Sequence, residues 1–381
     1  MQRRRVLSSL GACLGASTLA SVAGSAWAQA AAGSGAIVLG QSAPLTGPSA
    51  QLGLQFNLGA QLYFDQVNAA GGVNGRRIEL RRLDDGYEPE RCVANTKQFI
   101  ADGVFALFGY VGTASSLAAL PLATEAKMPF FAPFTGAQAL REPFNRYAIH
   151  VRASYFDETA AIVKQVTSIG IKRVAVFYQN DAYGKAGLEG VQRALKALGM
   201  EPAAVGTVER NSTEVAQALK DVLAVKPEAI VQIGAYKACA TFIRLARQQG
   251  YAGNFYNVSF VGTQALLDEL GAVAKGVAVS QVMPFPYSPA TPLSGEYLAA
   301  LKDQRGVSPN YSGIEGFVAA KVLVEGLKRA RGAGREAFID AIAGMKDVSI
   351  GGFPLDFGPQ KHTGSRFVEL TLLTEDGRVR R

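Results

Sequence analysis

Hydrophobic and polar positions along this chain form two kinds of segment that alternate. Short apolar runs such as residues 36–42 predict buried strands. Longer stretches such as residues 52–69 carry apolar residues three or four positions apart, which predicts amphipathic helices. Glycines within residues 70–75 end the first of these helices, because glycine readily adopts the left-handed conformation of a helix C-cap. The alternation predicts a parallel sheet with helices on both faces.

The same alternation returns in the second half of the chain. After the first strand and helix, the expected strands are 77–84, 105–108, 130–132, 173–178, 201–208, 229–233, 255–257 and 276–282. The expected helices are 88–102, 117–126, 159–169, 183–198, 213–225, 238–249, 264–270, 294–305, 313–330 and 335–343, with short strands and turns from residue 350 onward. Two α/β units of similar size in 381 residues predict a two-lobed protein.

The first 28 residues have the features of a cleaved export signal. Three arginines at positions 3 to 5 precede an apolar stretch over residues 6–23, and Ala26-Trp27-Ala28 fits cleavage before Gln29. An uncleaved membrane anchor, export by the twin-arginine route and lipid attachment at Cys13 are alternatives. No later segment is long and apolar enough to span a bilayer, so we expect the mature protein to be soluble.

Charge and composition exclude several classes of function. The chain has 39 basic and 31 acidic residues, and removing the three signal arginines lowers the net charge from +8 to +5. The basic residues are scattered, with no basic stripe or recognisable module, so we expect no nucleic-acid partner. His150 and His362 are the only histidines, which argues against a zinc site or imidazole catalysis. Cys92 and Cys239 lie in expected helices of different lobes, so we expect two partly buried free thiols.

A run of residues near the N-terminus carries a family resemblance. Residues 65–80, DQVNAAGGVNGRRIEL, resemble the first helix and turn of leucine/isoleucine/valine-type binding proteins, which are type I periplasmic binding proteins of ABC importers. Four further stretches fit the family in order: Asp84-Asp85 with Pro89, Phe108-Gly109 leading to Thr113-Ala114-Ser115-Ser116, residues 131–136, and residues 181–184. The resemblance extends from about residue 37 to about residue 367, nearly the whole mature chain.

The resemblance implies an α/β fold of two Rossmann-like lobes with parallel-rich sheets, joined by a three-strand hinge. The N-terminal lobe would comprise residues 30–153 and 283–352, and the C-terminal lobe residues 154–282 and 353–381. It also implies a monomer in the periplasm that closes around a small molecule and delivers it to the membrane permease of an ABC importer. Ligand touches both lobes only in the closed form, so binding shifts the population toward closure.

The strand ends offer groups suited to a carboxylate. In open α/β sheets, ligands bind beyond the carboxyl ends of the strands, where backbone N–H groups at helix starts attract anions. The turn over residues 113–116 and the loop over residues 133–136 each follow an expected strand. Carried over from the family, the ligand contacts fall on Leu52, Thr113, Phe134, Thr135, Gly136, Tyr183, Tyr236 and Ser259.

Each of these residues has a plainer alternative role. Thr113 and Ser115 could simply cap a helix, and the tyrosines could be core residues with satisfied hydroxyls. In the family pattern, Thr113 and Thr135 would grip the carboxylate, while Tyr183 and Tyr236 would close over the ligand from the opposite lobe. Leu52 would line the pocket that holds the side chain of the ligand.

Ser259 departs from the family pattern. Amino-acid binders place a carboxylate here to pair with the ligand's ammonium group, and a buried ammonium without an acidic partner is costly. Residues 256–262 contain no acid, so we expect aromatic or aliphatic carboxylates or small amides rather than ordinary α-amino acids. Glu315 could supply a charge from the other lobe, although we expect it on a solvated helix surface. We expect neither a cofactor nor a metal.

Three other functions remain open on the sequence. An enzyme has little support, because Gly184, Gly187 and Gly190 lie in an expected helix and do not form a dinucleotide-binding turn. A sensory module that presents its closed form to a receptor would have the same fold. A transcriptional regulator of the sugar-repressor type would begin with a DNA-reading helix pair, where this chain has an export signal.

Overall fold

The computed structural model describes residues 35–381, and the expected signal sequence and Cys13 lie outside this range. The first sheet is entirely parallel, in the order β2-β1-β3-β4-β5. Its strands are β1 (Ile37–Ala43), β2 (Ile78–Asp84), β3 (Ala106–Phe108), β4 (Phe130–Phe131) and β5 (Ala148–Ile149). Its early helices are α2 (Ala50–Ala69), α3 (Pro89–Ala101) and α4 (Thr113–Glu125), with the short 3-10 helix η1 (Gln138–Leu140).

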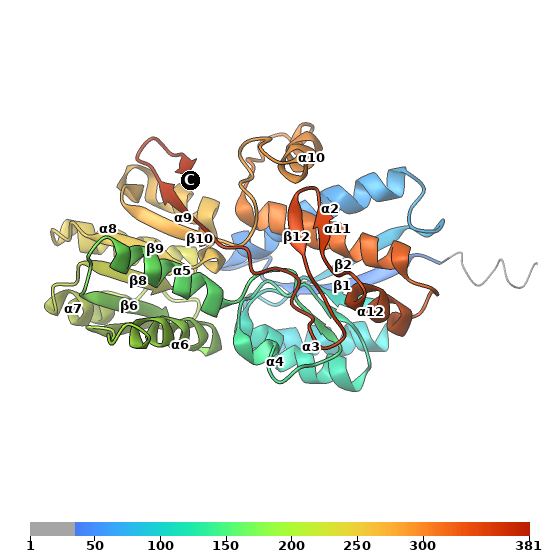
Figure 1. Ribbon diagram of the computed structural model, residues 1–381, viewed down its shortest axis with the longest axis horizontal. Coiled ribbons are helices and arrows are strands. Elements are labelled where there is room, and N and C mark those ends of the chain that lie inside the picture. The colour runs from blue at the N-terminus through green and yellow to red at the C-terminus, as the bar shows by residue number, and fades with distance from the viewer. Residues whose placement is uncertain (1–34) are drawn as a thin grey trace, which may run out of the picture.

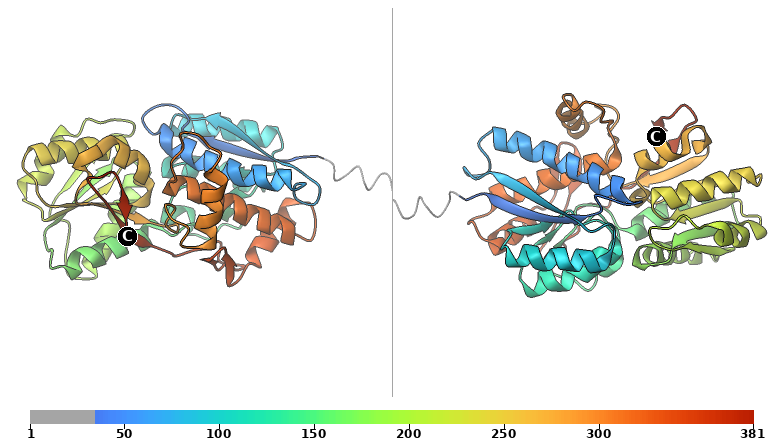
Figure 2. Two further views of the ribbon diagram at one scale, coloured as in Figure 1. Left: turned by 90° about the horizontal axis from the view of Figure 1, so that it is seen from above. Right: turned by 180° about the vertical axis from the view of Figure 1, so that it is seen from behind.

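Three later helices return to this first body of the molecule. They are α10 (Pro292–Leu301), α11 (Tyr311–Arg329) and α12 (Arg335–Ala343). Blue α2 and orange α11 pack together on one face of the first sheet, and α3 and α4 cover the other (Figure 2). The approach of α2 and α11 needs glycine, because a Cβ on Gly316 would lie 1.9 Å from the carbonyl oxygen of Phe56. A Cβ on Gly59 would lie 1.8 Å from the carbonyl oxygen of Gly313.

The second sheet has seven strands in the order β14-β13-β10-β9-β8-β6-β7. Strands β6 (Val174–Gln179), β7 (Val205–Val208), β8 (Ala229–Ile233), β9 (Asn254–Asn257) and β10 (Val277–Gln281) are parallel, while β13 (Glu369–Leu373) and β14 (Val379–Arg380) are antiparallel additions. The helices are α5 (Tyr155–Ser168), α6 (Ala182–Lys196), α7 (Ala216–Ala224), α8 (Tyr236–Gln248) and α9 (Thr263–Leu270), with η2 (Ser259–Val261) and η3 (Gly271–Ala274). The parallel-rich α/β fold expected from the alternating pattern is confirmed.

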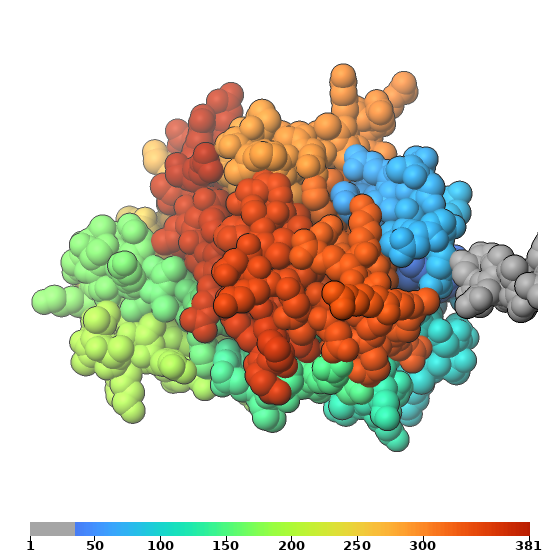
Figure 3. Space-filling view, turned by 45° about the vertical axis from the view of Figure 1, so that its right-hand side comes forward, coloured from blue at the N-terminus to red at the C-terminus, as the bar shows by residue number. Residues whose placement is uncertain are grey.

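The two sheets belong to two bodies that lie side by side (Figure 1). The chain passes between them three times, after β5, after β10 and before β13. In the space-filling view, orange and red atoms of the C-terminal part of the chain lie across the face between green atoms on the left and blue atoms on the right (Figure 3). The expected lobe limit after residue 352 falls inside a hairpin of β11 (Val348–Ile350) and β12 (Phe353–Leu355). Because the strands of a hairpin bond to each other, we place the third crossover after Leu355.

Local details differ from the sequence-based expectations. Helix α4 begins at Thr113 and not near residue 117, since the N–H of Ser116 donates to the carbonyl of Gly112. Gly112 has φ +96, and a Cβ there would lie 2.4 Å from the ring of Tyr87. Cys92 and Cys239 are both free and both buried, in agreement with the expectation of free thiols. Among the residues described, no helix combines the length and apolar character needed to cross a membrane.

Candidate functional site

Two threonine hydroxyls meet at the carboxyl end of the first sheet. Thr113 opens α4, and Thr135 lies in the loop after β4; their Oγ1 atoms are 2.7 Å apart and both side chains are buried. The N–H of Ala137 donates to Thr135 Oγ1 at 3.2 Å. The first N–H groups of an α-helix have no partner within the helix and carry the positive end of its dipole. The expected turn at residues 113–116 is therefore the first turn of a helix, and it places hydroxyls and amides in one small region.

Aromatic rings from both bodies close over this region. Tyr183, at the start of α6, and Phe134, beside Thr135, both pack on the ring of Phe260, with centroids 4.7 and 5.3 Å away. Tyr87 of the first body stacks on the same ring at 6.1 Å. Leu52 of α2 reaches the neighbouring turn, since a Cβ on Gly262 would lie 2.6 Å from its Cδ2. The crevice between the bodies is thus packed with side chains from each.

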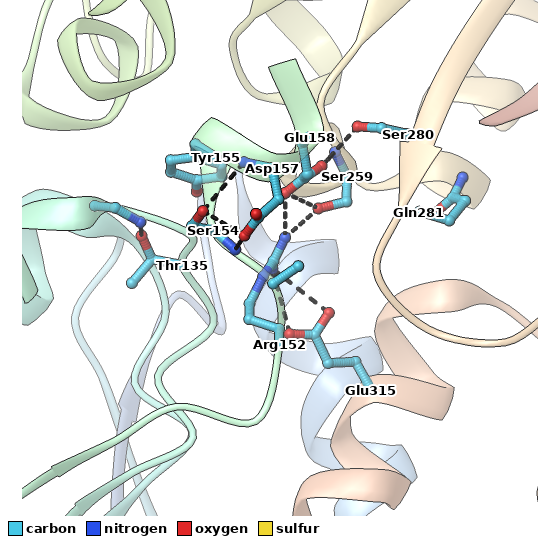
Figure 4. Close-up of polar contacts among 12 residues, drawn as sticks. Thr135, Arg152, Ser154, Tyr155, Asp157, Glu158, Ser259, Ser280, Gln281 and Glu315 are labelled. Atoms are coloured by element: carbon cyan, nitrogen blue, oxygen red, sulfur yellow. Dashed lines mark hydrogen bonds and ion pairs between the residues drawn. The ribbon is translucent and has the colours of Figure 1, made fainter. Parts of the chain in front are cut away.

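Arg152, on the first crossover, links the two bodies beside this aromatic cluster (Figure 4). Its Nη2 donates to Glu158 of α5 at 3.0 Å and also contacts the hydroxyl of Ser259. Its Nη1 donates to Glu315 of α11 at 3.3 Å. The guanidinium carbon lies 5.3 Å from the ring centroid of Phe134. Arg152 therefore bonds to the second body through Glu158 and to the first through Glu315.

The carboxylates of Glu158 and Glu315 differ in the number of groups that donate hydrogen bonds to them. Glu158 accepts four hydrogen bonds, from Arg152, from the N–H and hydroxyl of Ser259 at 2.7 and 3.0 Å, and from the hydroxyl of Ser280 at 2.6 Å. Glu315 has Arg152 as its one hydrogen-bond partner among residues 35–381, with distances of 3.3 and 3.5 Å. Burial raises the pKa of Glu315 to about 7, against the attraction of Arg152 that lowers it. Burial alone would lower the pKa of Arg152, but Glu315 and Glu158 outweigh it and raise that pKa.

The structure brings most of the expected site residues together. Four of them meet around the Phe260 turn and Arg152, namely Leu52, Phe134, Tyr183 and Ser259. Thr113 and Thr135 pair with each other next to Phe134. Gly136 packs under Tyr155, since a Cβ there would lie 2.6 Å from the Tyr155 ring. Tyr236 is buried at the start of α8, where burial raises its pKa and a hydrogen bond to the backbone of Gln51 partly offsets the rise.

Two expectations about charge are wrong. Glu315 is 5% exposed and paired with Arg152, so it does not lie on a solvated helix surface. Ser259 does have an acid beside it, because Glu158 reaches it from α5, about a hundred positions earlier in the chain. The residues that the sequence reasoning missed are Arg152, Glu158, Tyr155 and Phe260. The one local signal was Arg152 itself, a charged residue shortly after the apolar strand β5.

The cavities differ in position and size. A cavity of about 10 Å³ is lined by Phe134, Ser259, Gln281, Val282, Met283, Tyr311, Ser312 and Glu315. That is about the space one water molecule needs. A groove of about 730 Å³ lies elsewhere, lined by residues of η1, α5, α6 and the third crossover, and it contains none of the expected site residues. The small cavity borders the candidate site, because two expected site residues, Phe134 of the first body and Ser259 of the second, line it, whereas Thr113 and Thr135 do not.

Metal chemistry finds no support in the described part of the chain. Over residues 35–381, no group of three or more His, Cys, Asp and Glu side chains is arranged to hold a metal ion. The charged cluster instead consists of one guanidinium and two carboxylates. These three groups are joined to one another by hydrogen bonds and ion pairs.

Comparison with known proteins gives matches over most of the chain. A family profile described as periplasmic binding protein matches residues 36–378. An amino acid binding protein of Pseudomonas aeruginosa is 26% identical over 245 residues, which are 63% of this chain and 64% of that protein. The Leu/Ile/Val-binding protein homolog 7 of Brucella abortus is 23% identical over 376 residues, 92% of each chain. A crystal structure of a possible leucine/isoleucine/valine-binding protein from Rhodopirellula baltica SH 1 has a TM-score of 0.86 and 34% identity, over 89% of this chain and 94% of that one.

Proposed function

This chain belongs to the periplasmic binding protein family, and from that premise we propose that it is the substrate-binding component of an ABC importer. The solute we propose is a small molecule with a carboxylate, held between the two lobes. The relatives are binding proteins and not enzymes, which confirms the family and the absence of a catalytic role expected from the sequence.

The observation that carries the proposal is the Thr113–Thr135 pair at the start of α4. The two hydroxyls lie 2.7 Å apart and are hydrogen-bonded to each other, at the positive end of a helix dipole and beyond the strand ends. When a carboxylate replaces that bond, each hydroxyl is free to donate to it. Tyr155 adds a third hydroxyl near Thr135: burial raises its pKa to about 12, although Arg152 and a hydrogen bond with Thr135 act to lower it. All three hydroxyls remain protonated donors at neutral pH.

Hinge closure follows from how tightly the crevice is packed. The small cavity of about 10 Å³ has room for about one water molecule, so a solute would enter when the lobes separate. Contacts from both lobes then favour the reclosed form, and binding shifts the population toward it. The permease of the importer would distinguish the closed from the open form.

The charged cluster supports a solute without an α-ammonium group. Glu158 is fully engaged by four donors and has little capacity for a further cation. With a pKa of about 7, Glu315 keeps its proton in a large share of molecules at neutral pH, and a protonated carboxyl donates to a carboxylate or amide oxygen. We therefore propose that the solute is a carboxylate or amide without an α-ammonium group, in preference to an α-amino acid.

The test is a binding screen on the mature protein with a matched pair of variants. Thermal shift and calorimetry are run against aliphatic acids, aromatic acids, amides, leucine and valine. Changing Thr113 and Thr135 together to Val removes two hydrogen bonds to a charged group and is expected to weaken binding of the best acid about a hundredfold. Thr241→Val, which removes a hydroxyl bonded to the Lys237 carbonyl in α8, is the control and should leave affinity unchanged. Equal affinity in the double variant, or a strong preference for leucine or valine, would contradict the proposal.

A further inference from the structure

The ring of Phe260 lies between aromatic rings of the two lobes. It is fully buried, and three rings surround it: Tyr87 and Phe134 of the first lobe and Tyr183 of the second. The family pattern places Phe134 and Tyr183 on opposite sides of a ligand. Here both pack on Phe260, which therefore stands where the apolar body of a large ligand would lie.

The turn that carries Phe260 is held firmly to the second lobe. The N–H of Ser259 donates to Glu158 at 2.7 Å, and the N–H of Gly262 donates to the carbonyl of Ser259 at 3.2 Å. Gly262 has φ +80, a conformation that residues with a Cβ rarely adopt, and Leu52 packs directly against it. The ring of Phe260 therefore moves with the second lobe, and each closure returns it to the space between Phe134 and Tyr87.

A small cavity lies next to the turn that carries Phe260. It has a volume of about 10 Å³, and Phe134, Ser259 and Glu315 are among the polar and apolar residues that line it. A short chain needs only a small displacement of the lobes to fit there. A ring would have to take the face of Phe134 that Phe260 covers.

We infer that Phe260 is a specificity-determining residue that limits the size of the solute: the lobes close over short aliphatic carboxylates and exclude acids that carry a ring. This inference rests on the proposed function and names its substrate class. A ligand ring that packs on Phe134 displaces the ring of Phe260, so the closed form loses the free energy of burying one Phe side chain. By the usual worth of that burial, benzoate should bind about tenfold to a hundredfold more weakly than it would without the obstruction.

The test is a size-exchange experiment on the mature protein by titration calorimetry. The probes are propionate, butyrate, benzoate and the uncharged benzamide. Phe260→Ala opens a ring-sized space in the crevice, and Phe260→Leu opens a smaller one with less risk to folding. Phe242→Ala is the matched control, because its ring packs on Phe177 at 4.3 Å in the core of the same lobe and its removal leaves a space of similar size away from the crevice.

The expected result is that the natural protein binds propionate or butyrate and hardly binds benzoate. Phe260→Ala should gain at least tenfold in affinity for benzoate. The affinity of Phe260→Leu for benzoate should lie between those of the natural protein and Phe260→Ala, and Phe242→Ala should bind like the natural protein. The size limit is overturned if the natural protein binds benzoate as tightly as butyrate, or if no Phe260 variant gains affinity for a ring. Equal gains for benzoate and benzamide would keep the size limit and remove the carboxylate site, which separates this inference from the proposed function.

Discussion

Removing Arg152 should destabilise the protein far more than removing a surface arginine with just as many ion pairs. Arg152→Met keeps the apolar stem of the side chain and deletes the guanidinium. Glu158 and Glu315 are then left buried, at 0% and 5% exposure, without the cation between them. Breaking a buried ion pair from one side costs about 3–5 kcal/mol, because the remaining charge loses its compensation.

The matched control is Arg146→Met. Arg146 makes two ion pairs, with Glu336 at 2.9 Å and Asp340 at 2.8 Å, but its side chain is 40% exposed. Surface pairs contribute about 0–1 kcal/mol, so this change should cost little. For folding units of about 150–250 residues, each kcal/mol lowers the melting temperature by about 2–4 °C. We expect a fall of about 10 °C for Arg152→Met and of no more than about 4 °C for Arg146→Met.

The assay is thermal unfolding followed by circular dichroism and calorimetry at neutral pH, at about 0.15 M and about 1 M salt. Salt screens exposed charges and leaves buried ones little affected, so added salt should reduce the Arg146 difference and leave the Arg152 difference in place. A triple variant that adds Glu158→Gln and Glu315→Gln to Arg152→Met should recover much of the loss, because no buried charge remains. Equal shifts for the two arginine variants, or no recovery in the triple variant, would refute the assignment of Arg152 as the buried counter-ion.

Two further changes follow from the same geometry. The native pKa of Glu315, about 7, lies above its ordinary value of 4.5, so the native state retains a proton that the unfolded state releases as pH rises. The free energy of unfolding should therefore fall between pH 5 and pH 8 in the natural protein and fall less in Glu315→Gln; urea titrations that show parallel pH profiles would contradict this. Gly316→Ala should cost about 1–3 kcal/mol or more through collision with the Phe56 carbonyl. Gly295→Ala in α10, where the added Cβ would lie 3.8 Å from its nearest neighbour, should be neutral or slightly stabilising in thermal melts.

The sequence predicted the fold well because periodicity is a local property. Helix α11 was expected over 313–330 and lies at Tyr311–Arg329, and the strand expected over 229–233 is β8. The strand expected over 201–208 shrinks to Val205–Val208, an edge strand that has β6 on one side only. The pattern of apolar and polar residues defines the ends of an edge strand less sharply, because an edge strand pairs on one side only and exposes much of its surface.

The site was predicted only in part, because its polar contacts join distant positions. Thr113 and Thr135 follow expected strand ends, and the family resemblance assigned both to the ligand. Arg152 and Glu315 are 163 positions apart and lie on a crossover and a helix, and no local pattern relates them. The helix pattern around Glu315 could not distinguish a solvated face from one that faces a second lobe.

The late position of β13 in the chain has a consequence for how the molecule is made. Strand β13 covers the edge of β10 in the second sheet, and α11 covers α2 in the first body, so neither body is built from one continuous stretch. During synthesis, neither body can complete its fold until its later segment has been made. A chain released before residue 369 would carry β10 as an exposed, apolar edge, which is the kind of surface that recruits other strands and starts aggregation.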